Sequence, residues 1–365
     1  MVNSMSERTA TKPRERSKTL VAPQPVSVPL ARRLPFMPGG ILLALALLAL
    51  TLRTLALTYV APVPHASIAI YNRGDPQAAL ERIERENFTS IAELNRLADD
   101  PSLPRLERLA YRHAPLMLLH PGQSSPTSNT FIGIYYQASE TSSESITVTS
   151  LQYFFFSSDE RGGLLVRERL ALFGRPLDRE LVYRVTIIDG DVASAYYQAP
   201  GHKLVPLGYQ GEERPIFAIV SANNNFRPVL PAELERPGDF ELVVPYPHAE
   251  KVADPEHDPD FMALAAREAL LEHEVDLSHY LYIEFINPLH DGAVTLSARI
   301  KGRWYYLHSS VAGLTRPGYN QIGIYIGYAP RPEDIEEIRL IAYTTRSPEI
   351  EVLSIHLYPG LVLRS

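Results

Sequence analysis

One helix-end segment carries a histidine–glutamate pair of the kind that binds zinc in metalloproteases. His273 and Glu274 are adjacent, and His279 follows them. In the zinc-protease motif, two histidines lie four residues apart on one helix face, with the glutamate between them. Here the histidines are six residues apart, and the apolar helical pattern ends near Val275. We therefore interpret these side chains as the surface end of a helix.

Other side chains that could bind a metal or act as a nucleophile are sparse. His248, Glu256 and His257 lie in a proline-rich acidic segment and could bind a metal ion, but solvated histidines are the commoner outcome there. The chain has no cysteine, which excludes disulfides, thiol catalysis and thiolate metal ligands. It also has no Gly-x-Ser-x-Gly turn. The sequence thus indicates no catalytic residue and favours a protein that is not an enzyme.

The segment Leu106–Gln137 reads LERLAYRHAPLMLLHPGQSSPTSNTFIGIYYQ. Its alanine-proline-leucine run followed by leucine-histidine-proline resembles the opening of the vacuolar-protein-sorting sixty-two family of β-sandwich proteins. Further resemblances to that family follow in order at 151–160, 175–188, 195–202 and 214–226. The likeness covers about 105–245 and implies a β-sandwich there.

The resemblance also implies a candidate metal site. Necrosis-inducing toxins, which are related to this family, hold a divalent cation with histidine, aspartate and glutamate. Carried onto this chain, the motif implies Asp178 and Glu180 as acidic ligands, with His202 as a third. However, Arg175 stands where the family has a histidine, and Arg179 where it has a tryptophan. Two carboxylates beside two guanidinium groups favour a structural ion-pair network around Asp178, with a retained cation site as the alternative.

A second resemblance involves aromatic residues near the C-terminus. The strands over about 276–361 resemble the jelly roll of galactose-binding-like and carbohydrate-binding modules, which implies carbohydrate as a ligand. Aromatic rings on such a sheet stack against sugar rings. Strand alternation places Trp304 and Tyr306 on one face and Tyr305 on the other, which leaves the exposed face undecided and a purely structural jelly roll possible. The candidate ligand-binding residues are Trp304, Tyr305, Tyr306, Tyr319 and Tyr325.

The run over 40–61, GILLALALLALTLRTLALTYVA, has 22 residues and a single charge, Arg53. A helix of this length crosses a hydrocarbon core of about 30 Å. Residues 1–39 contain seven basic and two acidic residues, which predicts a cytoplasmic N-terminus. We therefore predict an uncleaved single-pass anchor in the cell membrane with an extracytoplasmic C-terminal ectodomain. A cleaved signal peptide and a buried helix of a soluble domain are the alternatives.

Composition restricts the partners of this ectodomain. Residues 62–365 contain 40 acidic and 27 basic residues, a net charge of −13. Nucleic acids and anionic lipid surfaces bind basic proteins, so neither is expected as a partner. The expected partners are the membrane, through 40–61, and carbohydrate, while the sequence leaves protein partners unknown.

Short runs of aromatic and β-branched residues, separated by Gly, Pro, Asn and Asp, predict a mainly β chain with two antiparallel β-sandwich or jelly-roll regions. Leu164–Phe173 is among the predicted strands. Asp75-Pro76, Ser90 and Asp258-Pro259 predict helix starts. The expected organisation is a disordered cytoplasmic tail over 1–39, a transmembrane helix over 40–61, a short helical stalk over 62–114, a β-sandwich over 115–245, a linker and helix over 246–275, and a C-terminal jelly-roll-like domain over 276–365.

Together these patterns favour a membrane-anchored, extracytoplasmic, non-enzymatic binding protein for polysaccharide or another envelope ligand. Two alternatives remain: a divalent-metal-dependent hydrolase or membrane-active protein, and a scaffold for envelope proteins. Asn87-Phe88-Thr89 also matches an N-glycosylation sequon.

Overall fold

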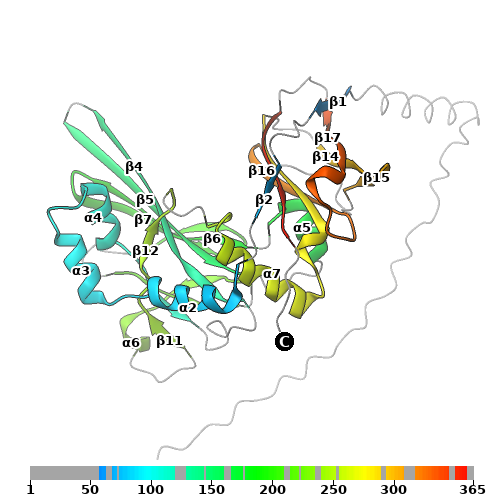
Figure 1. The fold of residues 1–365 in the computed structure, drawn as a ribbon. Coiled ribbons are helices and arrows are strands. Elements are labelled where there is room, and N and C mark those ends of the chain that lie inside the picture. The colour runs from blue at the N-terminus through cyan, green and yellow to red at the C-terminus, as the bar shows by residue number, and fades with distance from the viewer. Residues whose placement is uncertain are drawn as a thin grey trace, which may run out of the picture. The chain divides into compact units, whose positions relative to one another are not determined.

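The computed structural model confirms a mainly β protein (Figure 1). It describes residues 57–62, 68–71, 74–119, 129–143, 145–159, 166–175, 177–208, 214–221, 223–234, 240–251, 255–288, 293–307, 317–344 and 350–359. Residues 56–365 form one compact unit.

The first β region contains two sheets. The larger has the order β12 (Pro247–Ala249), β4 (Phe131–Ser143), β5 (Ile146–Ser157), β6 (Asp178–Ile188), β7 (Asp191–Ala199), β8 (Lys203–Pro206). The smaller has the order β10 (Phe226–Pro228), β9 (Ile216–Ile219), β3 (Leu116–Leu119), β11 (Glu241–Val243). Both sheets, together with α3 (Ile91–Asp99) and α4 (Arg105–Arg112), contribute to one hydrophobic cluster that includes Met117, Tyr153 and Phe217. Apolar side chains from two sheets that meet in one core give a sandwich-like arrangement.

The second β region contains two four-stranded sheets. One has the order β1 (Leu57–Pro62), β17 (Ile335–Thr344), β14 (Ala293–Ile300), β15 (Arg303–Tyr306). The other has the order β16 (Gly318–Tyr325), β13 (Tyr280–Asn287), β18 (Glu351–Leu357), β2 (Ile68–Ile70). A cluster of aliphatic residues from both sheets, with Phe285, forms its core. The N-terminal strands β1 and β2 therefore complete sheets made of C-terminal strands, as the blue and red arrows in Figure 1 show.

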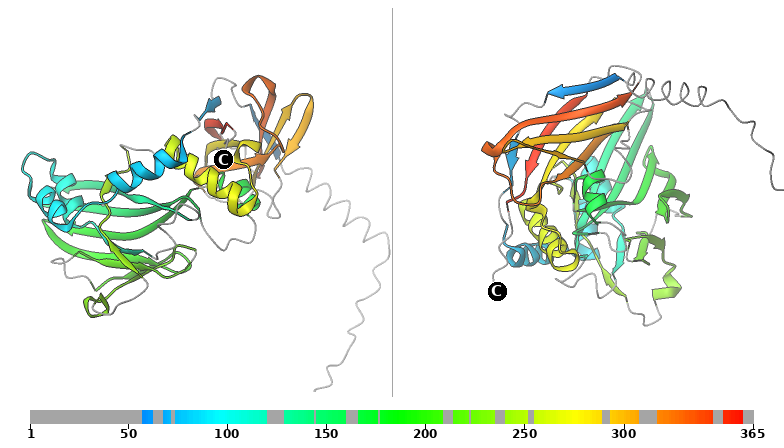
Figure 2. Two further views of the ribbon diagram at one scale, coloured as in Figure 1. Left: turned by 60° about the horizontal axis from the view of Figure 1, so that its bottom comes forward. Right: turned by 90° about the vertical axis from the view of Figure 1, so that its right-hand side faces the viewer.

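Three helices contribute to a third hydrophobic cluster, which also contains residues of both β regions. They are α2 (Pro76–Glu86), α5 (Val166–Phe173) and α7 (Pro259–His273), and they share a cluster with Tyr135 of β4 and Tyr282 of β13. Figure 2 shows α2 and α7 beside each other. The remaining short helices are α6 (Pro231–Leu234) and the 3₁₀ turns η3 (Leu277–His279) and η4 (Pro332–Asp334). The helices predicted within 62–114 thus pack against the β regions through buried residues.

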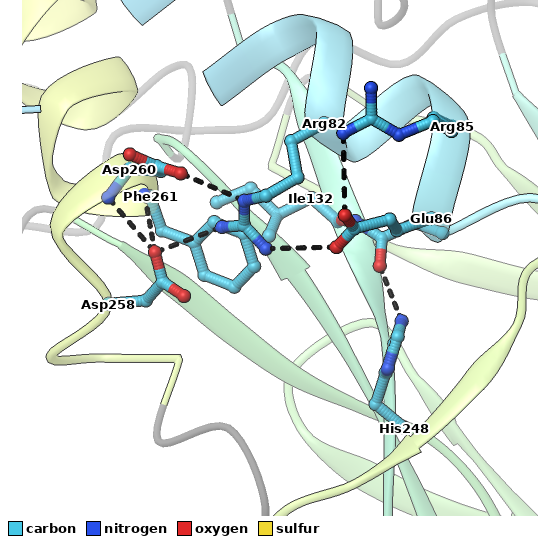
Figure 3. Close-up of polar contacts among 9 residues, drawn as sticks. Arg82, Arg85, Glu86, Ile132, His248, Asp258, Asp260 and Phe261 are labelled. Atoms are coloured by element: carbon cyan, nitrogen blue, oxygen red, sulfur yellow. Dashed lines mark hydrogen bonds and ion pairs between the residues drawn. The ribbon is translucent and has the colours of Figure 1, made fainter. Parts of the chain in front are cut away.

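Arg82 fixes α2 to the start of α7 (Figure 3). Its guanidinium donates to Asp258 at 3.0 Å and to Asp260 at 2.8 Å, and it stacks over the Phe261 ring at 5.0 Å. Asp258 is also the N-cap of α7, with Pro259 as the first helical residue, as predicted. One arginine therefore holds the residues that immediately follow His257.

The structure corrects the end of the predicted transmembrane helix. Leu57–Ala61 belong to β1, which pairs antiparallel with β17, so a helix over 40–61 cannot include its last five residues. The backbone of these residues bonds to a neighbouring strand instead of to itself. Residues 40–56 lie outside the described part of the chain. No helix among the described residues is both long and apolar enough to span a membrane.

Two further expectations need correction. The strand predicted over Leu164–Phe173 is wrong, because Val166–Phe173 form helix α5, which ends where Gly174 adopts a φ of +60° and donates to the Leu170 carbonyl. The sheets are also not purely antiparallel. The pairs β12–β4, β3–β9 and β18–β2 run parallel, which the long stretches of chain between the partner strands permit.

Candidate functional site

The three residues predicted as metal ligands line one cavity of about 510 Å³. Asp178 and Glu180 project from β6, and His202 lies in the turn between β7 and β8. His202 Nδ1 lies 3.4 Å from Glu180 Oε2, and Gln198 Nε2 lies 3.1 Å from the same histidine nitrogen. Gln198 also donates to the Glu180 carboxylate. Glu180, Gln198 and His202 therefore form one polar cluster at the cavity wall.

Asp178 is held by a different set of groups, a buried amide network. Asn224 Nδ2 donates to Asp178 Oδ2 at 2.6 Å and contacts Ser157 Oγ at 2.9 Å. Asn129 in turn donates to Asn224 Oδ1 at 2.9 Å. Both asparagines are buried and have a φ of 45°, a left-handed conformation that asparagine tolerates better than most residues. This network ties Asp178 to the loops that precede β4 and β10.

The two arginines near these carboxylates form ion pairs elsewhere. Arg175 pairs with Glu256 at 2.7 Å. Arg179 pairs with Glu250, lies 4.0 Å from Glu256, and stacks over Phe154 at 4.2 Å. These two arginines therefore do not form the predicted ion-pair network around Asp178, because their carboxylate partners in the described residues come from the segment between β12 and α7.

A second cavity, of about 530 Å³, shares Arg179 with the first. Among its lining residues are Glu256, His257, Glu284 and Tyr319, so both β regions and the β12–α7 segment contribute to its wall. The sequence predicts His257 as a possible metal ligand but gives no such prediction for Glu284. A usable signal was present, because a glutamate interrupts the apolar strand YLYIEFIN.

Two groups of side chains in the described residues have the donor atoms and proximity to hold a metal ion. The first is His257, Glu284 and His356, and the second is Asp159, Glu272 and His273. In the second group, Asp159 already pairs with Arg169 at 2.8 Å and with His273 at 2.7 Å. A guanidinium on the carboxylate competes with a metal ion for the same oxygens, so the first group is the better candidate.

The five aromatic candidates lie in separate places. Trp304 and Tyr306 share a face and stack at 6.4 Å, with Arg339 over the indole at 4.3 Å. Tyr305 packs against the sandwich core, as strand alternation predicts. Tyr319 lines the second cavity, and Tyr325 lines a smaller one of about 180 Å³ with Arg167 and Tyr280.

The structure contradicts the use of Asn87 as a glycan acceptor. Its side chain is 2% exposed, and its amide nitrogen donates to the Ile132 carbonyl. His248 Nε2 bonds to the Asn87 Oδ1 atom at 2.5 Å. Both ends of this amide are therefore engaged inside the fold.

Comparison with known protein families, curated proteins and solved structures gave no match for this chain.

Proposed function

We propose that this chain is a membrane-tethered binding protein that takes a carbohydrate into the 510 Å³ cavity beside β6. The observation that carries the proposal is the composition of the cavity wall, which combines Glu180, Gln198 and His202 with the Phe173 ring. Carboxylates and amides bind sugar hydroxyls, and aromatic rings pack against the apolar faces of sugars. Phe173 is exposed, so its ring is accessible for such a contact.

The proposal favours this cavity over the face of Trp304. Arg339 lies 4.3 Å from the indole ring centre and Arg299 lies 5.9 Å from it. A sugar stacking on this indole has to compete with two guanidinium groups for its faces. The cavity beside β6 offers hydrogen-bonding groups and an accessible aromatic ring together, whereas the Trp304 face offers mainly aromatic and cationic groups.

The membrane part of the proposal rests on the 17 residues of 40–56, which contain one charge, and on the basic segment that precedes them. We expect the full chain to sediment with membranes after alkaline washing and a chain lacking 40–56 to stay in the supernatant. Recovery of both chains in the same fraction contradicts the tether.

The ligand is tested by affinity electrophoresis of the full chain, in detergent, through gels containing galactan, β-glucan or dextran. We expect at least one polysaccharide to retard the wild type. The Gln198→Ala variant should lose most of this retardation, about 10-fold or more in affinity, because the change removes a hydrogen-bonding amide from the cavity wall. Trp304→Ala is the matched control and should be retarded like the wild type.

Two results overturn the proposal. The first is unchanged migration of the wild type in all three gels. The second is loss of retardation in Trp304→Ala with full retardation in Gln198→Ala, which moves binding to the sheet face. Thermal unfolding of each variant shows whether it is folded.

A further inference from the structure

We propose that His257, Glu284 and His356 form a binding site for one divalent transition-metal ion. The site is separate from the three residues on and near β6 that the sequence suggested, and it does not rest on the proposed carbohydrate binding. It involves two neighbouring strands and one loop of the C-terminal half of the chain.

The ligand atoms already converge. His257 Nε2 lies 2.6 Å from Glu284 Oε1, and His356 Nε2 lies 3.1 Å from Glu284 Oε2. One donor atom from each of the three residues lies within 4.8 Å of the others. Ligands about 2.0–2.2 Å from a zinc ion are roughly 3–3.5 Å from one another in tetrahedral geometry. An ion therefore fits between these side chains after small rotations.

The fold places these residues on one surface. Glu284 of β13 is opposite Ser354 of β18, and His356 is two residues further along β18, so both side chains project from the outer face of the same sheet. His257 reaches this face from the segment before α7, and the Arg82–Asp258 ion pair holds the next residue. The pairing of β13 with β18 and the Arg82–Asp258 ion pair at the start of α7 thus bring the three side chains together.

Groups around the ligands orient them. The Tyr71 hydroxyl bonds to His356 Nδ1, which leaves Nε2 directed at Glu284. Tyr71 also stacks on both histidine rings, at 4.9 Å for His356 and 5.6 Å for His257. Ser354 Oγ donates to Glu284 Oε2 at 2.5 Å. Metal-binding histidines are usually held through their second ring nitrogen, and Tyr71 supplies that contact here.

The electrostatics of the cluster suit a cation. Glu284 is 4% exposed. The polar partners of Glu284 in the described residues are the histidines, Ser354 and Tyr319, with no lysine or arginine among them. A divalent cation between the imidazoles would supply the positive charge that a buried carboxylate requires.

The same contacts argue against a serine nucleophile at Ser354. In a serine–histidine–acid triad, the serine and the acid contact different nitrogens of the histidine. Here Ser354 and Glu284 both contact Nε2 of His356, while Nδ1 is bonded to Tyr71. The Glu284 carboxylate therefore lies next to Nε2 of His356, the ring nitrogen that is available to a metal ion.

Two imidazoles and one carboxylate select the class of ion. Nitrogen ligands suit zinc, cobalt and ferrous iron, whereas calcium and magnesium prefer oxygen ligands alone. His257 and Glu284 also line the 530 Å³ cavity, which leaves room for water or a small ligand on the open side of the ion. Two histidines and one carboxylate leave open coordination positions on such an ion.

The test is isothermal titration of the full chain, in detergent and stripped of metal by a chelator, with Zn²⁺ and Co²⁺ and with Ca²⁺ and Mg²⁺ as comparison ions. We expect one Zn²⁺ or Co²⁺ to bind per chain and to raise the midpoint temperature of thermal unfolding. The visible absorption spectrum of bound Co²⁺ should indicate nitrogen ligands. His257→Ala should lose binding at least about 100-fold, because one of three ligands is gone. Tyr71→Phe should weaken binding about 10- to 100-fold, as expected for an orienting group.

Matched controls keep the assignment falsifiable. His273→Ala removes a histidine from the other candidate group, and His202→Ala removes the histidine beside Glu180, so both should bind Zn²⁺ like the wild type. His257 is partly exposed, so its variant is the one expected to stay folded. Absence of Zn²⁺ and Co²⁺ binding by the folded wild type overturns the proposal. Full binding by His257→Ala with lost binding by His202→Ala or His273→Ala also overturns it.

Discussion

At the scale of single residues, two histidines stay neutral inside the first β region. His113 follows α4, and burial, with the charges of Arg112 and Arg214, lowers its pKa to about 4. Burial also lowers the pKa of His248 to about 4. Of the nearby charges on α2, that of Glu86 raises this pKa and that of Arg82 lowers it. Both values lie well below the ordinary value of about 6.5. These histidines therefore act as neutral packing groups in the fold.

This neutrality predicts a loss of stability in mild acid. Between pH 6.5 and 4, the unfolded chain binds protons at His113 and His248 while the folded chain does not, so the stability present above pH 6.5 is lost as the pH falls through this window. The loss should be about 2 kcal/mol per histidine at pH 5. Urea unfolding at pH 7.5 and pH 5.0 measures it. A His113→Gln, His248→Gln double variant should lose less stability between these two pH values than the wild type does, and an equal loss in both proteins contradicts the prediction.

At the scale of elements, the sequence predicted local structure well wherever one residue type decides it. Asp75 and Asp258 each cap a helix that starts with proline, and Ser90 caps α3. Runs of aromatic and β-branched residues became strands. The segment LLVRERLALF has the apolar content of a strand and predicts one, whereas Gly174 after it is the signal of a helix C-terminus.

The candidate metal site could be predicted only in part, because its residues are brought together by tertiary structure. Glu284 and His356 lie on adjacent strands far apart in sequence, and His257 joins them through the packing of α2 on α7. Strand pairing of this kind has no local sequence signal. What the sequence did contain was a glutamate inside the largely apolar strand β13.

Glycines on two facing elements allow α5 to approach β16. A Cβ on Gly174 would lie 2.7 Å from the backbone nitrogen of Ile322, and a Cβ on Gly323 would lie 2.8 Å from the Leu170 carbonyl oxygen. Atoms at such distances overlap, so neither position accepts a larger residue without moving the helix. Gly174 is constrained twice, since its φ of +60° also disfavours other residues.

We therefore expect Gly174→Ala to lower the free energy of unfolding by more than the cost of φ alone. Gly302 is the matched control, because its φ is +76° and nothing lies within 4 Å of a Cβ there. Gly302→Ala should cost about 1 kcal/mol for conformation, and Gly174→Ala about 1–3 kcal/mol more for the overlap. Chemical denaturation of both variants gives the difference. Equal costs would show that α5 does not depend on close contact with β16.

At the scale of the whole molecule, the C-terminal sandwich is built from both ends of the described chain. β1 pairs with β17 along six residues, and β2 pairs with β18. The first β region, with its two sheets, lies in the sequence between β2 and β13. Strands that precede the first region therefore complete the second. Arg82 adds a further link, because it joins α2 to the helix that leads into β13.

This arrangement predicts how fragments behave. A fragment of residues 276–365 contains the C-terminal strands but lacks β1 and β2, so it exposes one edge of each sheet and the faces that α2 and α7 cover. Unpaired strand edges and uncovered apolar faces favour aggregation over folding. We expect this fragment to be insoluble or to unfold without cooperativity, and residues 56–365 to give one cooperative transition by circular dichroism. Joining residues 56–71 to the fragment through a flexible linker restores both edge strands but not the helices, so it should recover part of the structure. Cooperative unfolding of 276–365 alone would show that the N-terminal strands are dispensable, and that the second sandwich folds without the segment that precedes the first.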